Sequence, residues 1–337
     1  MSSDKTSQSL FDVAVVGGGP AGLTAALWLS RYLHDVVVID SGDPRNWETR
    51  AINGYTGLPD VQPGDLRGRA RDECRRYGTT LLDGCVVRAR PADDDLVVLD
   101  FEPIAETKAE QDAAGPGTIR APEDNTPSPQ SRAVRARRVL LSFGLKDEWP
   151  KLPGLRRVYG ATAHVCPDCD GYETRGRKVL VIASGRKAVG MALALRTWTP
   201  EIVVCTNGEP AELDEALRAR LDGLRIPVVT AAITCVLSEG DRVRCVELDT
   251  GESLTCEEIF FALGQRLADD LGAQLGCRRD GDGRLVVDEH FQTTVANVYA
   301  AGDIIPGSQI AIAAAGDGAR AAVAIHHSLL PEEQRMR

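Results

Sequence analysis

No apolar run in this 337-residue sequence approaches the roughly 18–20 residues that a membrane-spanning helix needs. The first residues, MSSDKTSQSL, are polar and lack the apolar core of a signal peptide. Hydrophobic residues still make up 43% of the chain and charged residues 26%, a balance typical of soluble globular proteins. We therefore expect a cytoplasmic protein with no membrane partner, and the length allows two domains with their own cores.

Positive charge is in short supply, since 39 Lys and Arg face 49 Asp and Glu and leave a net charge of −10. This balance argues against nucleic acid as the main partner. Two basic clusters, at 67–76 and 132–138, run against it. Such clusters are usually solvated faces, and the alternative is a docking patch for an acidic protein partner.

The nine cysteines are odd in number and scattered, unlike the cysteines of a secreted disulfide scaffold. Several lie in apolar runs, such as Cys205, and are expected to be small core residues. Only Cys166 and Cys169, in HVCPDCDGYE, form a recognisable pair. A single CxxC leaves open a metal site, an inert disulfide and a pair that passes electrons.

Residues 12–40 predict a strand, a helix and a second strand. The apolar run at 13–16 is typical of a short buried strand, and the apolar pattern at 20–34 is typical of a helix. The β-branched run at 36–39 predicts a second strand, which ends at Asp40.

Three glycines between the first strand and the helix complete a nucleotide-binding pattern. Gly17, Gly19 and Gly22 form G-x-G-x-x-G in the strand-to-helix context that this motif requires. The first allows a tight turn, the second a close approach of a pyrophosphate, and the third the packing of helix on strand. The phosphates would face the helix N-terminus, and Asp40 could accept hydrogen bonds from ribose hydroxyls.

The C-terminal segment favours FAD over NAD. Residues 293–325 resemble the second FAD motif of two-dinucleotide-domain flavoproteins, in which an aspartate, here Asp303 in YAAGD, binds the ribityl and phosphate part. The helix after that aspartate points its N-terminus at the flavin ring. LLSFG at 140–144 resembles the ATG turn of the same superfamily, with Ser142 and Phe143 replacing its first two residues.

Because the two halves of the FAD motif are far apart in sequence, a second domain must be inserted between them. We predict an α/β protein with two Rossmann-like (three-layer ββα) dinucleotide-binding domains. The FAD-binding domain would comprise 1–150 and 266–337, and the inserted domain 151–265, which repeats the strand–helix–strand plan at 178–208. Residues 102–131 are rich in Pro, Glu, Ala and Ser and predict a mobile loop between two strands of an antiparallel meander.

This arrangement resembles low-molecular-weight thioredoxin reductase. That family carries C-x-x-C-D shortly before the first strand of its inserted nucleotide domain, and here Cys169 precedes Lys178 in the same way. The resemblance implies a homodimeric, FAD-dependent thiol/disulfide oxidoreductase acting on a thioredoxin-like protein or a small dithiol or disulfide. It implies that the following residues hold FAD: Gly17, Gly19, Pro20, Ala21, Gly22, Asp40, Gly144, Gly302, Asp303, Gln309 and Ile310.

Two of these residues compete for one place. In the family a glutamine or its neighbour meets the flavin before the last helix. The spacing from Gln309 to Gly316 is one residue longer than the family pattern. Either Gln309 or Ile310 therefore occupies that place.

The resemblance favours electron transfer for the cysteine pair. A zinc site would need two further ligands, no second CxxC exists, and His164 is the only nearby candidate. By resemblance, Cys169 faces the flavin and Cys166 attacks an outside disulfide. Asp170 matches the family acid that protonates the departing thiol, with a turn-capping aspartate as the alternative.

The second nucleotide site departs from the family pattern. In ASGRKA at 183–188, Ala183 stands where the tight-turn glycine belongs, and Arg186 and Lys187 follow. The second strand ends in VVCTNGEP at 203–210, which offers neither arginines for a 2′-phosphate nor a carboxylate at its tip. We expect a domain that keeps its fold and its CxxC but does not use NAD(P)H, although the two cations leave a weak site as an alternative.

Two branches of the family share this departure. One contains thioredoxin reductases that do without pyridine nucleotides, including ferredoxin-linked and deep-branching forms. The other contains dithiol oxidases, which pass electrons to oxygen and commonly carry His after the CxxC. Asp170 stands there instead and favours a protein disulfide as substrate. A flavin-bound redox sensor and an inactive scaffold are the alternatives from other classes.

Overall fold

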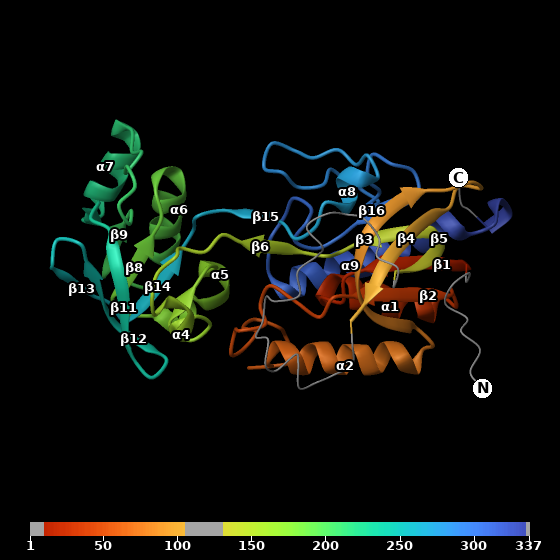
Figure 1. Ribbon diagram of the computed structural model, residues 1–337, viewed down its shortest axis with the longest axis horizontal. Coiled ribbons are helices and arrows are strands. Elements are labelled where there is room, and N and C mark those ends of the chain that lie inside the picture. Colours follow the sequence, from red (N-terminus) through yellow and green to blue (C-terminus); the bar gives the residue numbers. More distant parts are fainter. Residues whose placement is uncertain (1–9, 105–130, 335–337) are drawn as a thin grey trace.

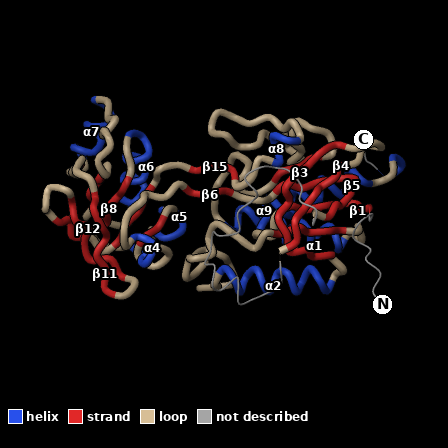
Figure 2. The backbone as a smooth tube through the Cα atoms, viewed as in Figure 1, coloured by secondary structure: helices blue, strands red, loops and turns tan. Residues whose placement is uncertain are grey.

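The computed structural model describes residues 10–104 and 131–334, and most of the loop expected at 102–131 lies outside them. The described chain forms two lobes (Figures 1 and 2). A two-stranded antiparallel ribbon, β6 (Leu145–Asp147) with β15 (Gln265–Leu267), connects them. The predicted α/β class is confirmed. The domain limits at 151 and 265 stay a prediction, and the ribbon is where the chain passes between the lobes.

The larger lobe is built on a six-stranded sheet. Its strands are β1 (Leu10–Val16), β2 (Val36–Asp40), β3 (Thr80–Pro91), β4 (Val97–Pro103), β5 (Arg132–Leu141) and β16 (Val298–Ala300). β1 lies between β2 and β5 and is parallel to both, and β5 also pairs in parallel with β16. β4 pairs antiparallel with β3 and β5, so the expected meander forms and is continuous with the parallel sheet.

Helices of the larger lobe pack against this sheet. They are α1 (Pro20–Arg31), α2 (Pro63–Arg76), α8 (Leu271–Gln274) and α9 (Ala311–Leu329), followed by the 3-10 turn η3 (Glu332–Gln334). α1 and α9 lie side by side because small residues meet between them: a Cβ on Gly318 would come within 2.1 Å of the carbonyl oxygen of Ala21. α1 is shorter than the predicted 20–34, since Leu33 has a φ of 65° and ends the helix in a left-handed conformation.

The smaller lobe contains a five-stranded parallel sheet in the order β10-β9-β8-β14-β7. Its strands are β7 (Ala163–His164), β8 (Val179–Ile182), β9 (Ile202–Cys205), β10 (Val228–Val229) and β14 (Glu258–Phe261). A three-stranded antiparallel sheet adds β11 (Ile233–Glu239), β12 (Arg242–Leu248) and β13 (Ser253–Thr255). The helices are α4 (Leu155–Val158), α5 (Pro167–Asp170), α6 (Gly185–Leu195) and α7 (Glu215–Gly223), with the 3-10 turn η2 (Tyr172–Thr174).

The central strands of this smaller sheet are buried on both faces. β8 is a continuous apolar run, β14 is apolar after Glu258, and separate apolar clusters cover the two faces of the sheet. The strand–helix–strand unit predicted at 178–208 corresponds to β8, α6 and β9. None of the helices in the described ranges, 10–104 and 131–334, is at once long and apolar enough to cross a membrane.

Candidate functional site

One continuous pocket extends from the glycine turn of the larger lobe to the cysteine pair of the smaller lobe. Every residue expected to hold FAD lines this pocket except Gly22. Cys166, Cys169 and Asp170 line it as well, although their segment belongs to the smaller lobe. The fold therefore brings together the two groups of residues that the sequence singled out.

The glycine turn after β1 has the geometry that the motif predicts. Gly17 has a φ of +104°, and a Cβ there would lie 2.5 Å from the carbonyl oxygen of Ser142. A Cβ on Gly22 would lie 2.0 Å from the carbonyl oxygen of Gly17, which is why this glycine lies behind the turn and not in the pocket wall. A Cβ on Gly19 would meet nothing within 4 Å, and α1 begins at Pro20 without a side-chain cap. The helix start is thus left open to a ligand.

Asp40 ends β2 in the wall of the pocket and is buried. Arg67 donates to its Oδ2 from Nε at 3.0 Å, and Nη1 of Arg71 lies 3.4 Å from the same oxygen. Burial raises the pKa of the Asp40 carboxyl, but the charge and hydrogen bond of Arg67 outweigh it and hold that pKa below its ordinary value. The interpretation of 67–76 as a solvated face is therefore wrong for these two arginines.

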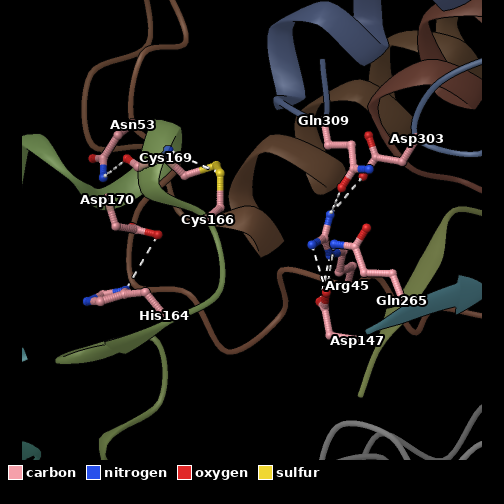
Figure 3. The surroundings of a disulfide bond; sticks show 10 residues. All are labelled: Arg45, Asn53, Asp147, His164, Cys166, Cys169, Asp170, Gln265, Asp303 and Gln309. Atoms are coloured by element: carbon pink, nitrogen blue, oxygen red, sulfur yellow. Dashed lines mark hydrogen bonds and ion pairs between the residues drawn. A yellow bond between two sulfur atoms is a disulfide. The ribbon is translucent and has the colours of Figure 1, made fainter. Parts of the chain in front are cut away.

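An arginine that the sequence did not single out, Arg45, lies beside Asp303 (Figure 3). Arg45 holds Asp147 through two hydrogen bonds, of 2.6 and 2.8 Å. Its Nη1 also donates to Gln309 Oε1 at 3.0 Å and lies 3.4 Å from Asp303 Oδ2. Burial raises the pKa of Asp303, and Arg45 opposes that effect. Gln309 and Ile310 both line the pocket, so the choice between them stays open.

Cys166 and Cys169 form a disulfide at the start of α5, with their Cα atoms 5.3 Å apart. The backbone N–H of Cys169 donates to Cys166 Sγ at 3.2 Å. Asn53 of the larger lobe donates from Nδ2 to the carbonyl oxygen of Cys169 at 3.1 Å, which fixes the pair against the pocket (Figure 3). The other cysteines are free thiols, and burial raises the pKa of both Cys74 and Cys85 to about 11, so neither is a reactive thiolate near neutral pH.

Asp170 follows Cys169 directly and faces a buried histidine. His164 Nδ1 lies 3.5 Å from Asp170 Oδ2, and His164 Nε2 lies 3.2 Å from Glu258 Oε2 (Figure 3 shows the first contact). Burial lowers the pKa of His164, but hydrogen bonds to Asp170 and Glu258 outweigh it and raise that pKa to about 9. The sequence had raised His164 only as a zinc ligand. Within the described ranges, no three His, Cys, Asp or Glu side chains are grouped so as to hold a metal ion.

The turn after β8 is closed by the chain itself. The N–H of Gly185, the first residue of α6, donates to the carbonyl oxygen of Ala211 at 2.9 Å. A Cβ on Gly185 would lie 3.5 Å from the carboxylate of Glu212. Lys187, one of the two cations that left a weak nucleotide site as the alternative, donates from Nζ to a backbone carbonyl just after β14. A backbone oxygen and a carboxylate therefore stand at the helix start, where a pyrophosphate would need free N–H groups.

A family model described as pyridine nucleotide-disulphide oxidoreductase matches residues 11–318. One component of the alkyl hydroperoxide reductase of Pseudomonas putida is 26% identical over 333 residues, covering 95% of this chain and 58% of that protein. Thioredoxin reductase of Bacillus subtilis (strain 168) is 23% identical over 331 residues, covering 95% of each chain. This chain thus spans only a little over half of the alkyl hydroperoxide reductase component and nearly all of the thioredoxin reductase.

Solved structures agree with the family model. HlmI superposes with a TM-score of 0.82 and 30% identity, covering 96% of this chain and 94% of HlmI. An oxidoreductase from Agrobacterium tumefaciens gives a TM-score of 0.77 at 29% identity, covering 95% of this chain and 99% of that one. Together with the pocket and its disulfide, these matches establish that the chain is an oxidoreductase, similar to thioredoxin reductase, and that it belongs to the pyridine nucleotide-disulphide oxidoreductase family of flavoproteins.

Proposed function

We propose that this protein is an FAD-dependent thiol/disulfide oxidoreductase that does not use NAD(P)H. Electrons would move between the flavin and the Cys166–Cys169 pair, and between that pair and a protein disulfide. The observation that carries the proposal is the shared pocket, because it has the glycine turn of the larger lobe at one end and the disulfide at the other. FAD would supply two-electron redox chemistry there.

The residues in the pocket fit FAD. The turn at Gly17 and Gly19 leaves room for a pyrophosphate, and the uncapped start of α1 offers N–H groups to it. Asp40 and Asp303 line the same pocket, where carboxylates can accept hydrogen bonds from ribose and ribityl hydroxyls. Arg45, which forms an ion pair with Asp303, adds a positive charge to the pocket wall.

The cysteine pair supports a division of roles. The Cys169 N–H that reaches Cys166 Sγ would stabilise negative charge on Cys166 once the disulfide opens. This favours Cys166 as the thiolate that exchanges with an outside disulfide, and leaves Cys169 for the flavin. Asp170 is proposed as the acid and base of that exchange, since it lines the pocket directly after Cys169.

Independence of NAD(P)H is supported by the closed turn of the smaller lobe. The contact of Gly185 with Ala211 takes an N–H group that a pyrophosphate would use, and Glu212 adds negative charge beside it. The reductant would then be another protein, such as a ferredoxin, or a dithiol. We further propose a thioredoxin-like protein as the disulfide partner and a homodimer as the working form, both from the resemblance to thioredoxin reductases.

A dithiol oxidase is the second candidate. Cys166 and Cys169 are only half-buried and line a pocket that a small dithiol could enter. In that case electrons would run from the dithiol through the disulfide and flavin to oxygen. The presence of Asp170 after the CxxC, where such oxidases commonly carry His, favours the first candidate.

The test is anaerobic stopped-flow absorbance of the oxidised flavin against NADPH, NADH, reduced ferredoxin and a small dithiol. We expect slow bleaching by both nucleotides and fast bleaching by the dithiol, by ferredoxin or by both. Fast, saturable bleaching by micromolar NADPH would refute independence of NAD(P)H. Oxygen consumption with the dithiol alone would support the oxidase.

Cysteine variants test the division of roles. Cys166→Ser should leave Cys169 as a lone thiolate against the flavin and give a long-wavelength charge-transfer band, which Cys169→Ser should lack. Cys245→Ser is the matched control, because Cys245 is a half-buried free thiol of β12 in the same lobe. A band in Cys169→Ser and none in Cys166→Ser would mean that Cys166 faces the flavin and Cys169 exchanges with the substrate. If neither variant gave a band, the cysteine pair would not contact the flavin in the resting protein.

A further inference from the structure

A buried chain of charged side chains leads away from the cysteine pair. It begins at Asp170, continues through His164 at the end of β7 to Glu258 at the start of β14, and ends at Arg177. The side chains of His164 and Glu258 are only 8% and 3% exposed, whereas that of Arg177 is 38% exposed. The chain therefore connects the pocket to the protein surface.

The geometry around His164 favours its protonated form. Its two ring nitrogens face two carboxylates, Asp170 on Nδ1 and Glu258 on Nε2. A carboxylate oxygen beside each ring nitrogen offers an acceptor to a hydrogen on both nitrogens, and this placement favours the imidazolium form of the ring. Arg177 donates to the other oxygen of Glu258, so that carboxylate lies between two cationic groups. The raised pKa of His164, about 9, agrees with this assignment.

This arrangement is unlike a histidine that only fills a core. A buried imidazolium would be costly unless its surroundings compensated the charge, and here two carboxylates do so. The charged groups in contact with it are Asp170 from α5 and Glu258 from β14, with Arg177 behind Glu258, while the ring of Phe260 lies 5.2 Å away. One of the two carboxylates is the residue next to the disulfide.

We propose that His164 is a positioning residue for the thiol–disulfide step: as an imidazolium it holds Oδ2 of Asp170, so that the other carboxylate oxygen serves the thiols. This inference rests on the proposed function, and it assigns His164, Glu258 and Arg177 to the same site. Loss of the proton from His164 removes the donor on Asp170 and with it the orientation of that carboxylate.

Reduction of the Cys166–Cys169 disulfide by a dithiol balances in atoms and electrons. A dithiol thiolate attacks Cys166 Sγ, the Cys166–Cys169 bond breaks, and Cys169 leaves as a thiolate. The second thiol of the reagent gives its proton to Asp170 and attacks the reagent sulfur bonded to Cys166. The reagent leaves as a cyclic disulfide, and the Cys166 thiolate takes the proton back from Asp170. Two electrons have passed to the cysteine pair, and one proton has moved through Asp170.

The pH dependence of the dithiol reaction tests the inference. Rates of flavin bleaching by a dithiol are measured from pH 6 to 10 and divided by the thiolate fraction of the reagent. For the wild-type protein we expect a constant value that falls as the pH passes about 9, the pKa of His164. His164→Gln should be slower by roughly tenfold or more at pH 7 and should lack this fall.

Glu258→Gln keeps the hydrogen-bonding shape but removes a negative charge from His164. The fall in rate should therefore move to a lower pH, toward the ordinary histidine value of about 6.5. If His164 had a purely structural role, Glu258→Gln would not change the pH at which the rate falls. His290→Gln is the matched control, because His290 is exposed and its side chain forms an ion pair with the neighbouring Glu289, away from the pocket.

Protein stability gives a second readout that does not depend on activity. The pKa of His164 is about 9 in the folded protein, above its ordinary value of 6.5. Its contribution to stability is therefore complete below pH 6.5 and is lost as the pH rises through about 9. The melting temperature of the wild type should fall over this window, and that of His164→Gln should fall less.

The outcomes separate the inference from the proposed function. If Cys166→Ser abolishes dithiol bleaching while His164→Gln and Glu258→Gln keep the wild-type profile, the inference is wrong and the function stands. If Cys166→Ser bleaches as fast as the wild type, the proposed function fails. Should His164→Gln not fold, as judged by bound flavin and circular dichroism, the shifted limb of Glu258→Gln decides alone, and an unshifted limb overturns the inference.

Discussion

The two strand–turn–helix units of this chain follow one plan but meet different surroundings where the first strand ends. In the larger lobe, Gly19 faces open space and the helix start at Pro20 lines the pocket. In the smaller lobe, the first N–H of α6, on Gly185, is bonded to Ala211, and Glu212 lies beside it. The same fold therefore leaves the helix start open in one lobe and occupied by the chain itself in the other, and a phosphate site depends on free N–H groups.

The smaller lobe keeps a second feature of its family while its nucleotide turn is closed. Its CxxC segment lines the pocket of the larger lobe, and Asn53 holds it there. Under the proposed function, this lobe would contribute the redox groups, and its strand–helix–strand unit would support them. Substitutions that act differently on the two units can break or sharpen this comparison.

Gly22→Ala should have the largest effect, because the close approach behind the first turn leaves no room for a methyl group. The new Cβ would lie 2.0 Å from the carbonyl oxygen of Gly17 and 2.6 Å from Ser142 Oγ. We expect a loss of roughly 3 kcal/mol or more in the free energy of unfolding and protein that purifies with little flavin. Chemical denaturation and the flavin-to-protein absorbance ratio measure these effects, and a yellow variant of wild-type stability would contradict this account of the turn.

Asp303→Ala should have the next largest effect and act on cofactor affinity. It removes a half-buried carboxylate from the pocket wall, where a charge-assisted hydrogen bond is worth about 1.5–3 kcal/mol. FAD should bind roughly 10- to 150-fold more weakly, as measured by titrating the apoprotein and following flavin fluorescence. Asp282→Ala, at an exposed turn, is the control and should bind FAD like the wild type. Equal affinity in both variants would remove Asp303 from the site.

The part of the site that the sequence predicted consists of residues close together in the chain. Gly17 and Gly19 lie in one turn with Gly22 in the helix just behind it, and Cys166 caps the short helix that contains Cys169, so their geometry follows from local rules. The glycine pattern and the CxxC were therefore sufficient to predict them.

The part that was missed consists of pairs that only the fold brings together. Arg45 meets Asp303, and His164 meets Glu258, across long separations in sequence. No spacing rule connects such pairs. For Arg67 and Arg71 a local signal did exist, because they are four residues apart on one face of α2, although their partner Asp40 lies on another element.

The turn after β8 in the smaller lobe was predicted only in part. The absence of the tight-turn glycine at Ala183 and of arginines after β9 predicted a poor nucleotide site. The contact that closes the turn was not readable, since Glu212 adopts a φ of 52°, a left-handed conformation that glutamate seldom favours. Its position follows from the tertiary structure.

Ala183→Gly tests whether the missing glycine alone explains the second turn. Ala183 is buried, so the loss of its methyl group should cost about 1 kcal/mol of stability. NADPH and NADH should still bleach the flavin slowly, because the Gly185 N–H remains bonded to Ala211. Stopped-flow absorbance compares the variant with wild type and with the double variant Ala183→Gly/Glu212→Gly. Fast bleaching in the single variant would show that Ala183, and not the segment around Glu212, closes the site.

Gly190→Ala should have the smallest effect, and in the opposite direction from Gly22→Ala. Gly190 is exposed in the interior of α6, and a Cβ there would meet nothing within 4 Å. Because alanine is the better helix former, the variant should gain roughly 0.5–1 kcal/mol in the free energy of unfolding, with flavin content and dithiol bleaching unchanged. Gly171→Ala is the control for crowding in the same lobe, since its Cβ would come within 2.4 Å of the Trp198 ring and should destabilise the protein. If Gly190→Ala instead slowed the reaction, a glycine in α6 would be needed for function, and this helix would have to do more than support the cysteine pair.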